Sequence, residues 1–223
     1  MSDTLHRTDR DLKSSLEQEL RWSPDVKADR IGVSVTDGAV TLAGEVPTYP
    51  EKDAAVAAAF RVKGVTAVAN NIVVMHLGGR REDVDIAREA ARALESTVTI
   101  PPGSVKAAVD HGRITLTGLV AWNYQREAAR RAVKDLPGVL SVSSDVVLEP
   151  DLPFAAGQAR THIREALVRN AETDASTITV SVQGTQIVLT GTVHSWSEFR
   201  QAANTAWGTP GVTGVLNRLT VVA

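Results

Sequence analysis

Histidine is the side chain of this sequence best suited to catalysis or metal binding, because imidazole can transfer a proton or ligate a metal near neutral pH. The chain has five histidines: His6, His76, His111, His162 and His194. None belongs to an HExxH motif or to another paired spacing that would place two imidazoles on one metal. His111 and His194 can meet only if separate parts of the chain pack together. We therefore expect the histidines to be solvated surface residues.

Other catalytic chemistries lack their residues. The sequence has no cysteine, which removes disulfides, thiolate metal sites and cysteine nucleophiles. It contains no GxSxG, P-loop or GxGxxG pattern, and the Gly78-Gly79 pair lacks the strand-to-helix context of a phosphate site. We predict that the protein is not an enzyme and uses neither a cofactor nor a metal. The alternative, an enzyme, would need a polar site assembled between repeated parts of the chain.

One helical segment carries a basic face. Arg126, Arg130 and Lys134 recur at spacing four, with Arg131 beside them. Near an anionic leaflet each such residue contributes about 1 kcal/mol, so this face is a candidate for weak binding to anionic phospholipid. The alternative is an ordinary solvated helix face on which the basic residues pair with nearby acidic ones.

The overall charge argues against nucleic acid as a partner. The formal net charge is −2. Residues 1–77 carry 9 basic and 11 acidic side chains, residues 78–150 carry 10 of each, and residues 151–223 carry 5 of each. Because affinity for a phosphate polyanion rests on clustered lysine and arginine, we expect no nucleic-acid binding.

Glycine spacing shows that the chain is a triple repeat. Gly44, Gly118 and Gly191 end similar stretches (TLAG, TLTG and VLTG) and lie 74 and 73 residues apart. A second set lies 20 residues after the first, and each member is followed by valine: Gly64, Gly138 and Gly211. We predict three tandem modules at residues 1–77, 78–150 and 151–223. Breaker-rich linkers are expected at residues 77–81 and 149–157.

Hydrophobic periodicity predicts the same elements in each copy. Spacing-four apolar residues such as Leu12, Leu16 and Leu20 indicate a buried helix stripe. Period-two residues around Asp37-Gly38 indicate a β-hairpin, and a second helix and a third strand follow. The predicted fold class is α+β, with each module ordered helix-strand-strand-helix-strand. Each module is expected to form a mixed three-stranded sheet with two helices on one face and a right-handed crossover.

Two local details are also predicted. Thr48-x-x-Glu51 and Ser195-x-x-Glu198 fit capping boxes at the start of the second helix, and Asn123 is the expected cap in copy two. The third hairpin is expected to carry one extra residue. Its two glycines are seven residues apart, where those of the other copies are six apart.

The tryptophans lie beside the second helices. Trp122 falls near the start of the helix that carries the basic face, while Trp207 aligns with Phe60 and Lys134 across the copies. Two explanations stay open for Phe60 and Trp207. They pack against a neighbouring copy, which we favour, or they form exposed apolar contacts for a partner or a membrane interface.

No segment approaches the roughly 20 apolar residues that a membrane span requires. The start, MSDTLHRTDRDLK, alternates charge and polarity where a secretory signal would be apolar. These features predict a cytoplasmic protein, with peripheral attachment to the membrane as the second expectation.

The repeated pattern resembles the BON domain, a bacterial module named from osmotically induced and nodulation proteins. The matching stretches are G-x-V-x-L-x-G-x-V in Gly38–Val46 and, with isoleucine for the first valine, in Gly112–Val120. G-V-x-x-V-x-N follows in Gly64–Asn70 and Gly211–Asn217. Copy two departs from the pattern with Ser144 in place of the asparagine, and copy three departs at its hairpin. The resemblance implies a non-catalytic module that binds phospholipid surfaces or partners in the cell envelope, and one relative has a potassium-sensing role.

These observations favour a non-enzymatic binding or scaffolding protein in a stress or envelope-maintenance context. It would present surfaces to anionic phospholipid or to a protein partner. The candidate contact residues are Trp122, Arg126, Arg130, Arg131, Lys134, Phe60 and Trp207. The alternative is a potassium- or ion-responsive stress protein, which follows only from the family resemblance.

Overall fold

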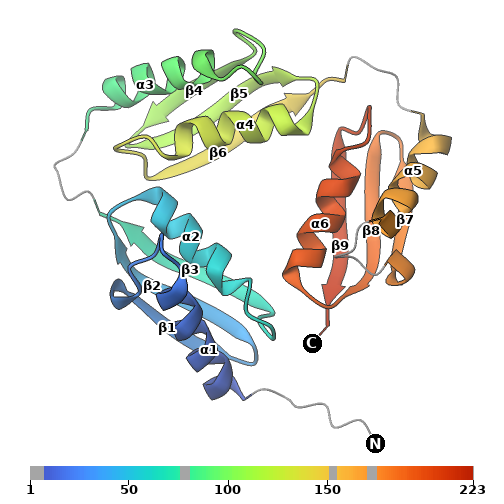
Figure 1. Cartoon of the computed structure of the whole chain (residues 1–223). Helices are drawn as coiled ribbons and strands as arrows, with labels where there is room; N and C mark the ends of the chain where they lie inside the picture. The colour runs from blue at the N-terminus through green and yellow to red at the C-terminus, as the bar shows by residue number, and fades with distance from the viewer. Residues whose placement is uncertain (1–7, 76–80, 151–154, 170–174, 223) are drawn as a thin grey trace, which may run out of the picture. The chain divides into compact units, whose positions relative to one another are not determined.

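The structure is a computed structural model that describes residues 8–75, 81–150, 155–169 and 175–222 (Figure 1). His6, His76 and parts of both predicted linkers lie outside the described residues. The chain divides into two compact units, residues 1–80 and residues 81–222. The first unit contains one three-stranded sheet and the second contains two. The predicted module boundaries adjoin residues outside the described ranges and stay predictions.

The same elements recur three times, in the predicted order. The first module comprises α1 (Asp9–Trp22), the 3-10 turn η1 (Ala28–Arg30), β1 (Ile31–Thr36), β2 (Ala39–Val46), α2 (Tyr49–Ala59) and β3 (Ala67–Val74). The second comprises α3 (Asp83–Ser96), β4 (Val105–Asp110), β5 (Arg113–Val120), α4 (Asn123–Lys134) and β6 (Ser141–Leu148). The third comprises α5 (Ala156–Arg169), η2 (Ala175–Thr177), β7 (Ile178–Gln183), β8 (Gln186–Val193), α6 (Trp196–Trp207) and β9 (Gly214–Val221).

Each sheet is mixed, as the sequence predicts. The strand orders are β1-β2-β3, β4-β5-β6 and β7-β8-β9, so the hairpin's second strand is central in every module. The central strand pairs antiparallel with the strand before it and parallel with the strand after it. Both outer strands of each module are therefore edges of its sheet. Both helices of a module lie on the same face of its sheet (Figure 1).

The helix stripes form the cores, because residues at spacing four project from one side of a helix. In the first module Leu12, Leu16 and Leu20 are at most 2% exposed, and Leu42 of the central strand is fully buried beneath them. The second helices supply alanines such as Ala55 and Ala59, whose small side chains allow close approach to the sheet. None of a module's own described helices covers the opposite face of its sheet (Figure 1).

The repeated central-strand glycine has a steric cause. A Cβ built on Gly44, Gly118 or Gly191 would lie 2.0 Å from a backbone carbonyl oxygen of the loop that leads into the hairpin. The three glycines also have φ values of +148°, +141° and +126°, a range that side chains disfavour. The motif therefore marks a close backbone crossing within the fold.

The hairpin turns correct one expectation. All three hairpins have equal length, because Ile31 pairs with Gly44, Val105 with Gly118, and Ile178 with Gly191, each pair 13 residues apart. The predicted extra residue in copy three is therefore wrong. The glycine has instead moved to the first turn position, where Gly184 has φ +60°.

The moved glycine corresponds to a different turn type. Asp37-Gly38 and His111-Gly112 have positive φ at both turn positions, which is the type I′ pattern. In Gly184-Thr185 only the first position has positive φ, as in type II′. Counting from glycine to glycine therefore misplaced the third turn by one residue.

The helix caps follow the sequence in part in two modules and depart from it in the third case. Thr48 accepts a hydrogen bond from the Glu51 backbone N–H, and Ser195 accepts one from Glu198, as predicted. The carboxylates do not complete the capping boxes: Glu51 accepts the backbone N–H of Lys27 and Glu198 that of His194. In copy two the N-cap is Trp122, and Asn123 is already helical, so the expected Asn123 cap is wrong. The buried Gln125 carboxamide accepts the Trp122 backbone N–H at 3.0 Å, which satisfies one donor of the helix end and fixes Trp122 as the residue before the first turn.

Candidate binding surface on the middle module

The basic helix face, defined as Arg126, Arg130, Arg131 and Lys134, lies on α4. This helix buries Gln125, Ala128, Ala129 and Val133 against its sheet. The four cations therefore fall on the flanks and the outer side of the helix, where Arg131 is exposed and the other three are half-buried. Glu127, also half-buried, is the one acidic side chain of the helix. The local balance of α4 is four cations against one anion.

An aromatic pair stands at the N-terminus of the same helix. The rings of Trp122 and Tyr124 lie 6.2 Å apart between centroids at an interplanar angle of 32°. Tyr124 is 54% exposed, and Trp122 is half-buried. The Trp122 backbone N–H donates to Gln125 Oε1 at 3.0 Å, which ties the backbone of Trp122 to the first turn of α4. Exposed aromatic rings beside cations are typical of surfaces that meet a membrane interface.

The other two modules do not share this surface. The four positions equivalent to the basic helix face hold Lys52, Val56, Ala57 and Phe60 in α2, and Phe199, Ala203, Asn204 and Trp207 in α6. The single cation among these eight, Lys52, donates from Nζ to the Ile72 carbonyl oxygen at 2.6 Å. Its charge is thus engaged within its own module. The middle module alone has the basic face.

Phe60 and Trp207 lie where their own modules explain them. Phe60 is the C-cap of α2 and packs, partly buried, against the core of the first module. Trp207 ends α6 and packs in the same way against the core of the third module. The partial burial of Phe60 is thus explained within its own module. Trp207, in addition, contacts the middle module, as the favoured explanation predicted.

Within the unit formed by residues 81–222, Trp207 also contacts the basic helix face. The Arg126 guanidinium carbon lies 5.0 Å from the centroid of the Trp207 ring, a cation–π distance. Arg126 also donates from Nη2 to Asn123 Oδ1 at 2.6 Å. Arg126 is therefore already engaged on two sides, whereas Arg131 presents its charge to solvent.

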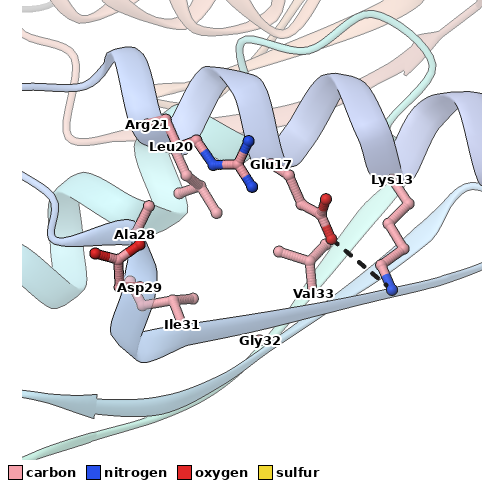
Figure 2. Close-up of a pocket in the computed structure, with 9 residues that line it drawn as sticks. All are labelled: Lys13, Glu17, Leu20, Arg21, Ala28, Asp29, Ile31, Gly32 and Val33. Carbon is pink, nitrogen blue, oxygen red and sulfur yellow. Dashed lines mark ion pairs between the residues drawn. The ribbon is translucent and has the colours of Figure 1, made fainter.

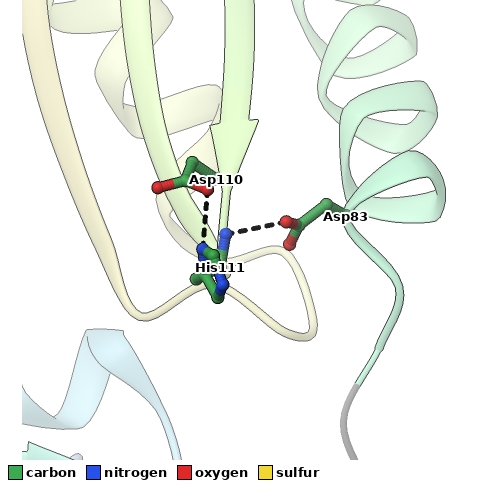
Figure 3. Close-up of side chains that lie close together, drawn as sticks. All are labelled: Asp83, Asp110 and His111. Atoms are coloured by element: carbon green, nitrogen blue, oxygen red, sulfur yellow. Dashed lines mark hydrogen bonds and ion pairs between the residues drawn. The ribbon is translucent and has the colours of Figure 1, made fainter.

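The structure also groups His111 with Asp83 and Asp110, two carboxylates that the sequence did not single out (Figure 3). Asp83 Oδ2 accepts the His111 backbone N–H at 2.7 Å and Oδ1 accepts that of Gly112 at 2.8 Å. His111 Nδ1 lies 2.6 Å from Asp110 Oδ1. Both Asp83 carboxylate oxygens thus bond to the turn between β4 and β5. We call this pair of hydrogen bonds, which joins the start of α3 to the hairpin, the Asp83 latch.

The first module has the same latch. Asp9 Oδ2 and Oδ1 accept the backbone N–H groups of Asp37 and Gly38 at 2.9 and 3.1 Å. In the third module the equivalent position is Ala156, which cannot accept a hydrogen bond through its side chain. The latch is therefore a feature of the fold in two modules. Its residues are separated by 28 or 29 positions in sequence, which is why no local pattern revealed it.

Comparison with known proteins decides the family. The BON domain model matches residues 8–75, 82–150 and 156–223. The chain belongs to the BON domain family. This agrees with the resemblance read from the glycine motifs, and members of the family are typically non-enzymatic.

A curated relative and two solved structures give further likenesses. Osmotically-inducible protein Y of Escherichia coli (strain K12) is 28% identical over 127 residues, which cover 55% of this chain and 63% of the relative. The match thus spans less than two thirds of that protein. Two structures of CdsD, a structural protein of the type III secretion system of Chlamydia trachomatis, are 16% and 15% identical. They cover 95% and 96% of this chain and 92% and 98% of their own, each with a TM-score of 0.27.

The described helices include none that is both long and apolar enough to cross a bilayer.

Proposed function

We propose that this BON-domain protein is a non-enzymatic binding protein that attaches peripherally to anionic phospholipid surfaces through its middle module. One observation carries the proposal: α4 combines four cations with the Trp122 and Tyr124 rings at one end of the same helix. The equivalent helices of the other modules lack this combination. On a shared scaffold, such a difference in outward side chains indicates a difference in what the surface binds.

The expected affinity is modest. Each Lys or Arg near an anionic leaflet contributes about 1 kcal/mol. Because Arg126 is engaged by Trp207 and Asn123, the other three cations opposed by Glu127 give roughly 2 kcal/mol of preference for anionic over neutral lipid. This corresponds to a ratio of roughly 30-fold in partitioning. Binding of this strength is reversible and sensitive to salt. It suits a protein that associates with a membrane surface when conditions require it.

The likeness to osmotically-inducible protein Y suggests the context. An osmotic upshift alters the membrane surface and the ionic strength beside it, and both affect an electrostatic contact of this kind. We therefore propose that the binding acts within an osmotic-stress response.

Co-sedimentation of the full chain with vesicles tests the proposal. Binding is measured to vesicles of phosphatidylglycerol mixed with phosphatidylcholine and to vesicles of phosphatidylcholine alone, at low and at physiological salt. The double variant Arg131→Gln/Lys134→Gln removes about 2 kcal/mol and should weaken binding to the anionic vesicles about 30-fold. The double variant Arg92→Gln/Lys106→Gln removes the same charge from exposed positions of α3 and β4, and it should bind like the wild type.

Two results would defeat the proposal. Equal binding of the wild type to anionic and neutral vesicles would remove the electrostatic basis. An equal loss in the two double variants would show that net charge matters and that the basic helix face does not. A chain that binds neither vesicle would direct attention to the alternative occupant of this face, a protein partner.

A further inference from the structure

A hollow of about 570 Å³ lies between the second helices of the middle and third modules, within the unit formed by residues 81–222. We call it the α4–α6 hollow. From α4 and its cap it is lined by Trp122, Asn123, Tyr124, Glu127 and Arg131, and from α6 by Asn204 and Trp207. Its volume falls in the range of small-molecule sites, about 300–1,000 Å³. The hollow is therefore large enough for a small ligand.

Three aromatic side chains line the α4–α6 hollow. The 6.2 Å between the Trp122 and Tyr124 centroids is the spacing of rings in mutual contact, so a ligand packs on the pair and not between the two rings. Trp207 contributes from α6, where the Arg126 guanidinium at 5.0 Å ties its ring to α4. At the positions of Trp122 and Tyr124 the other modules have Thr48 and Pro50, and Ser195 and Ser197. The ring pair is thus particular to the middle module.

Two opposite charges in the α4–α6 hollow are not paired with each other. Glu127 and Arg131 stand one helical turn apart on α4, the spacing at which such side chains commonly pair. Neither side chain forms an ion pair or a hydrogen bond with another of the described residues. Both charges are therefore available to a ligand.

The hollow beneath α1 in the first module shows the contrast (Figure 2). It measures about 300 Å³, and the apolar side chains that line it are aliphatic: Leu20, Ala28, Ile31 and Val33. Lys13 and Glu17 are also one helical turn apart, but they pair, with Lys13 Nζ 3.8 Å from Glu17 Oε1. The two charges there satisfy each other, whereas those of the α4–α6 hollow do not.

The hydrogen-bonding groups of the α4–α6 hollow define the class of ligand. The Glu127 carboxylate only accepts hydrogen bonds, and the Arg131 guanidinium only donates them. A phosphate or carboxylate ligand would meet Glu127 with like charge, and an ammonium would meet Arg131 in the same way. Hydroxyl groups avoid both conflicts, because each one donates and accepts. The aromatic pair adds a preference for C–H groups, whose partial positive charge suits the negative face of a ring.

We propose that the α4–α6 hollow binds a saccharide. A sugar ring packs a face of C–H groups on Trp122 and Tyr124, while its hydroxyl groups donate to Glu127 and accept from Arg131. Asn123 adds a donor, because its Oδ1 already accepts from Arg126 at 2.6 Å and its Nδ2 remains. This activity goes beyond the lipid binding proposed above and does not rest on it.

Titration of the full chain with maltose, cellobiose and N,N′-diacetylchitobiose tests the proposal. The chain has four tryptophans, so its indole N–H groups give four NMR signals, which single tryptophan-to-phenylalanine variants assign. We expect at least one disaccharide to shift the Trp122 and Trp207 signals to saturation. The Trp22 signal should stay in place. It is the internal control, because Trp22 is 85% exposed and open to non-specific packing of a sugar.

Variants locate the site. Tyr124→Ala removes one ring of the aromatic pair and should raise the dissociation constant of the disaccharide about tenfold. The matched control Trp22→Ala removes an exposed ring from α1 and should leave the constant unchanged. Glu127→Gln replaces a charged acceptor with a neutral one and should raise the constant about fivefold. Its control is Asp53→Asn at the equivalent position of α2, which should have no effect.

The same Glu127→Gln variant separates this proposal from lipid binding. Removing the one anion of α4 should strengthen binding to anionic vesicles about fivefold while it weakens saccharide binding, so either proposal can fail while the other holds. The absence of a shift with all three disaccharides overturns the saccharide proposal. An equal shift of the Trp22 and Trp122 signals does so too, as does wild-type affinity in both Tyr124→Ala and Glu127→Gln. If adenosine shifts the Trp122 signal and no disaccharide does, the ligand is a planar base and the proposal is wrong.

Discussion

The Asp83 latch makes a sharp prediction about local stability. Replacing Asp83 with alanine removes the acceptor of two N–H bonds, from His111 at 2.7 Å and from Gly112 at 2.8 Å. Hydrogen bonds to a charged group contribute about 1.5–3 kcal/mol each when well shielded. Asp83 is only half-buried and the turn is partly exposed, so we expect the two bonds together to contribute about 2 kcal/mol.

The matched control lies two residues away. Asp85 also belongs to the first turn of α3, but it forms an exposed ion pair with Arg88 at 2.9 Å. Asp83→Ala and Asp85→Ala remove the same charge from the helix N-terminus and so change its dipole interaction alike. The difference between them isolates the latch.

Native-state hydrogen exchange of the full chain is the suitable assay, because a protein of several modules need not unfold in one step. We expect the amide protection of the β4–β5 hairpin to fall about 30-fold in Asp83→Ala, as 2 kcal/mol requires. In Asp85→Ala it should fall by less than about threefold, in keeping with the small value of exposed ion pairs. If the two variants lose equal protection, the latch contributes nothing and the reasoning from its hydrogen bonds is refuted.

Two further changes test the repeated motifs by thermal unfolding. Gly118→Ala should destabilise the second module by about 3 kcal/mol or more, because the new Cβ would lie 2.0 Å from the Ser104 carbonyl oxygen. The control is Gly103→Ala: Gly103 also has a positive φ, but its Cβ would meet open space, so this change should cost about 1 kcal/mol. Ser144→Asn should stabilise the same module by about 1 kcal/mol, because the Ser144 hydroxyl is buried without a hydrogen-bond partner. At the equivalent position of the third module, Asn217 donates to the Phe199 carbonyl oxygen and accepts the Leu219 backbone N–H. An unchanged or lower melting temperature would contradict this prediction.

The parts of the fold that the sequence predicted rest on local chemistry. The helix stripe of Leu12, Leu16 and Leu20 and the alternating strand residues report burial directly, because side-chain direction follows the backbone period. The tandem glycines marked the modules for the same reason, since Gly44 and its equivalents occupy positions that exclude a Cβ. These features need no knowledge of what lies across the fold.

The features that could not be predicted depend on contacts between residues far apart in the sequence or on backbone geometry that the local sequence does not specify. The Asp83 latch joins residues 28 positions apart. The third turn kept its length while its glycine moved, so glycine counting failed there. The cap at Trp122 uses a carboxamide three residues downstream. The exposure of surface side chains is also hard to predict: Trp22 is 85% exposed, and no pattern in α1 indicated that this tryptophan would point to solvent.

Three copies of one scaffold in one chain also constrain where binding differences can lie. The buried positions and the central-strand glycines are fixed by packing, so they vary little in character from copy to copy. Side chains that face outward are free of that constraint, and there the copies diverge. The first has aliphatic side chains and an ion pair at its hollow, and the second has a basic helix with two aromatic rings. Each copy therefore serves as the control for the others. A surface with a binding role should respond to substitution in one module while the same substitution at the equivalent position of another has no effect.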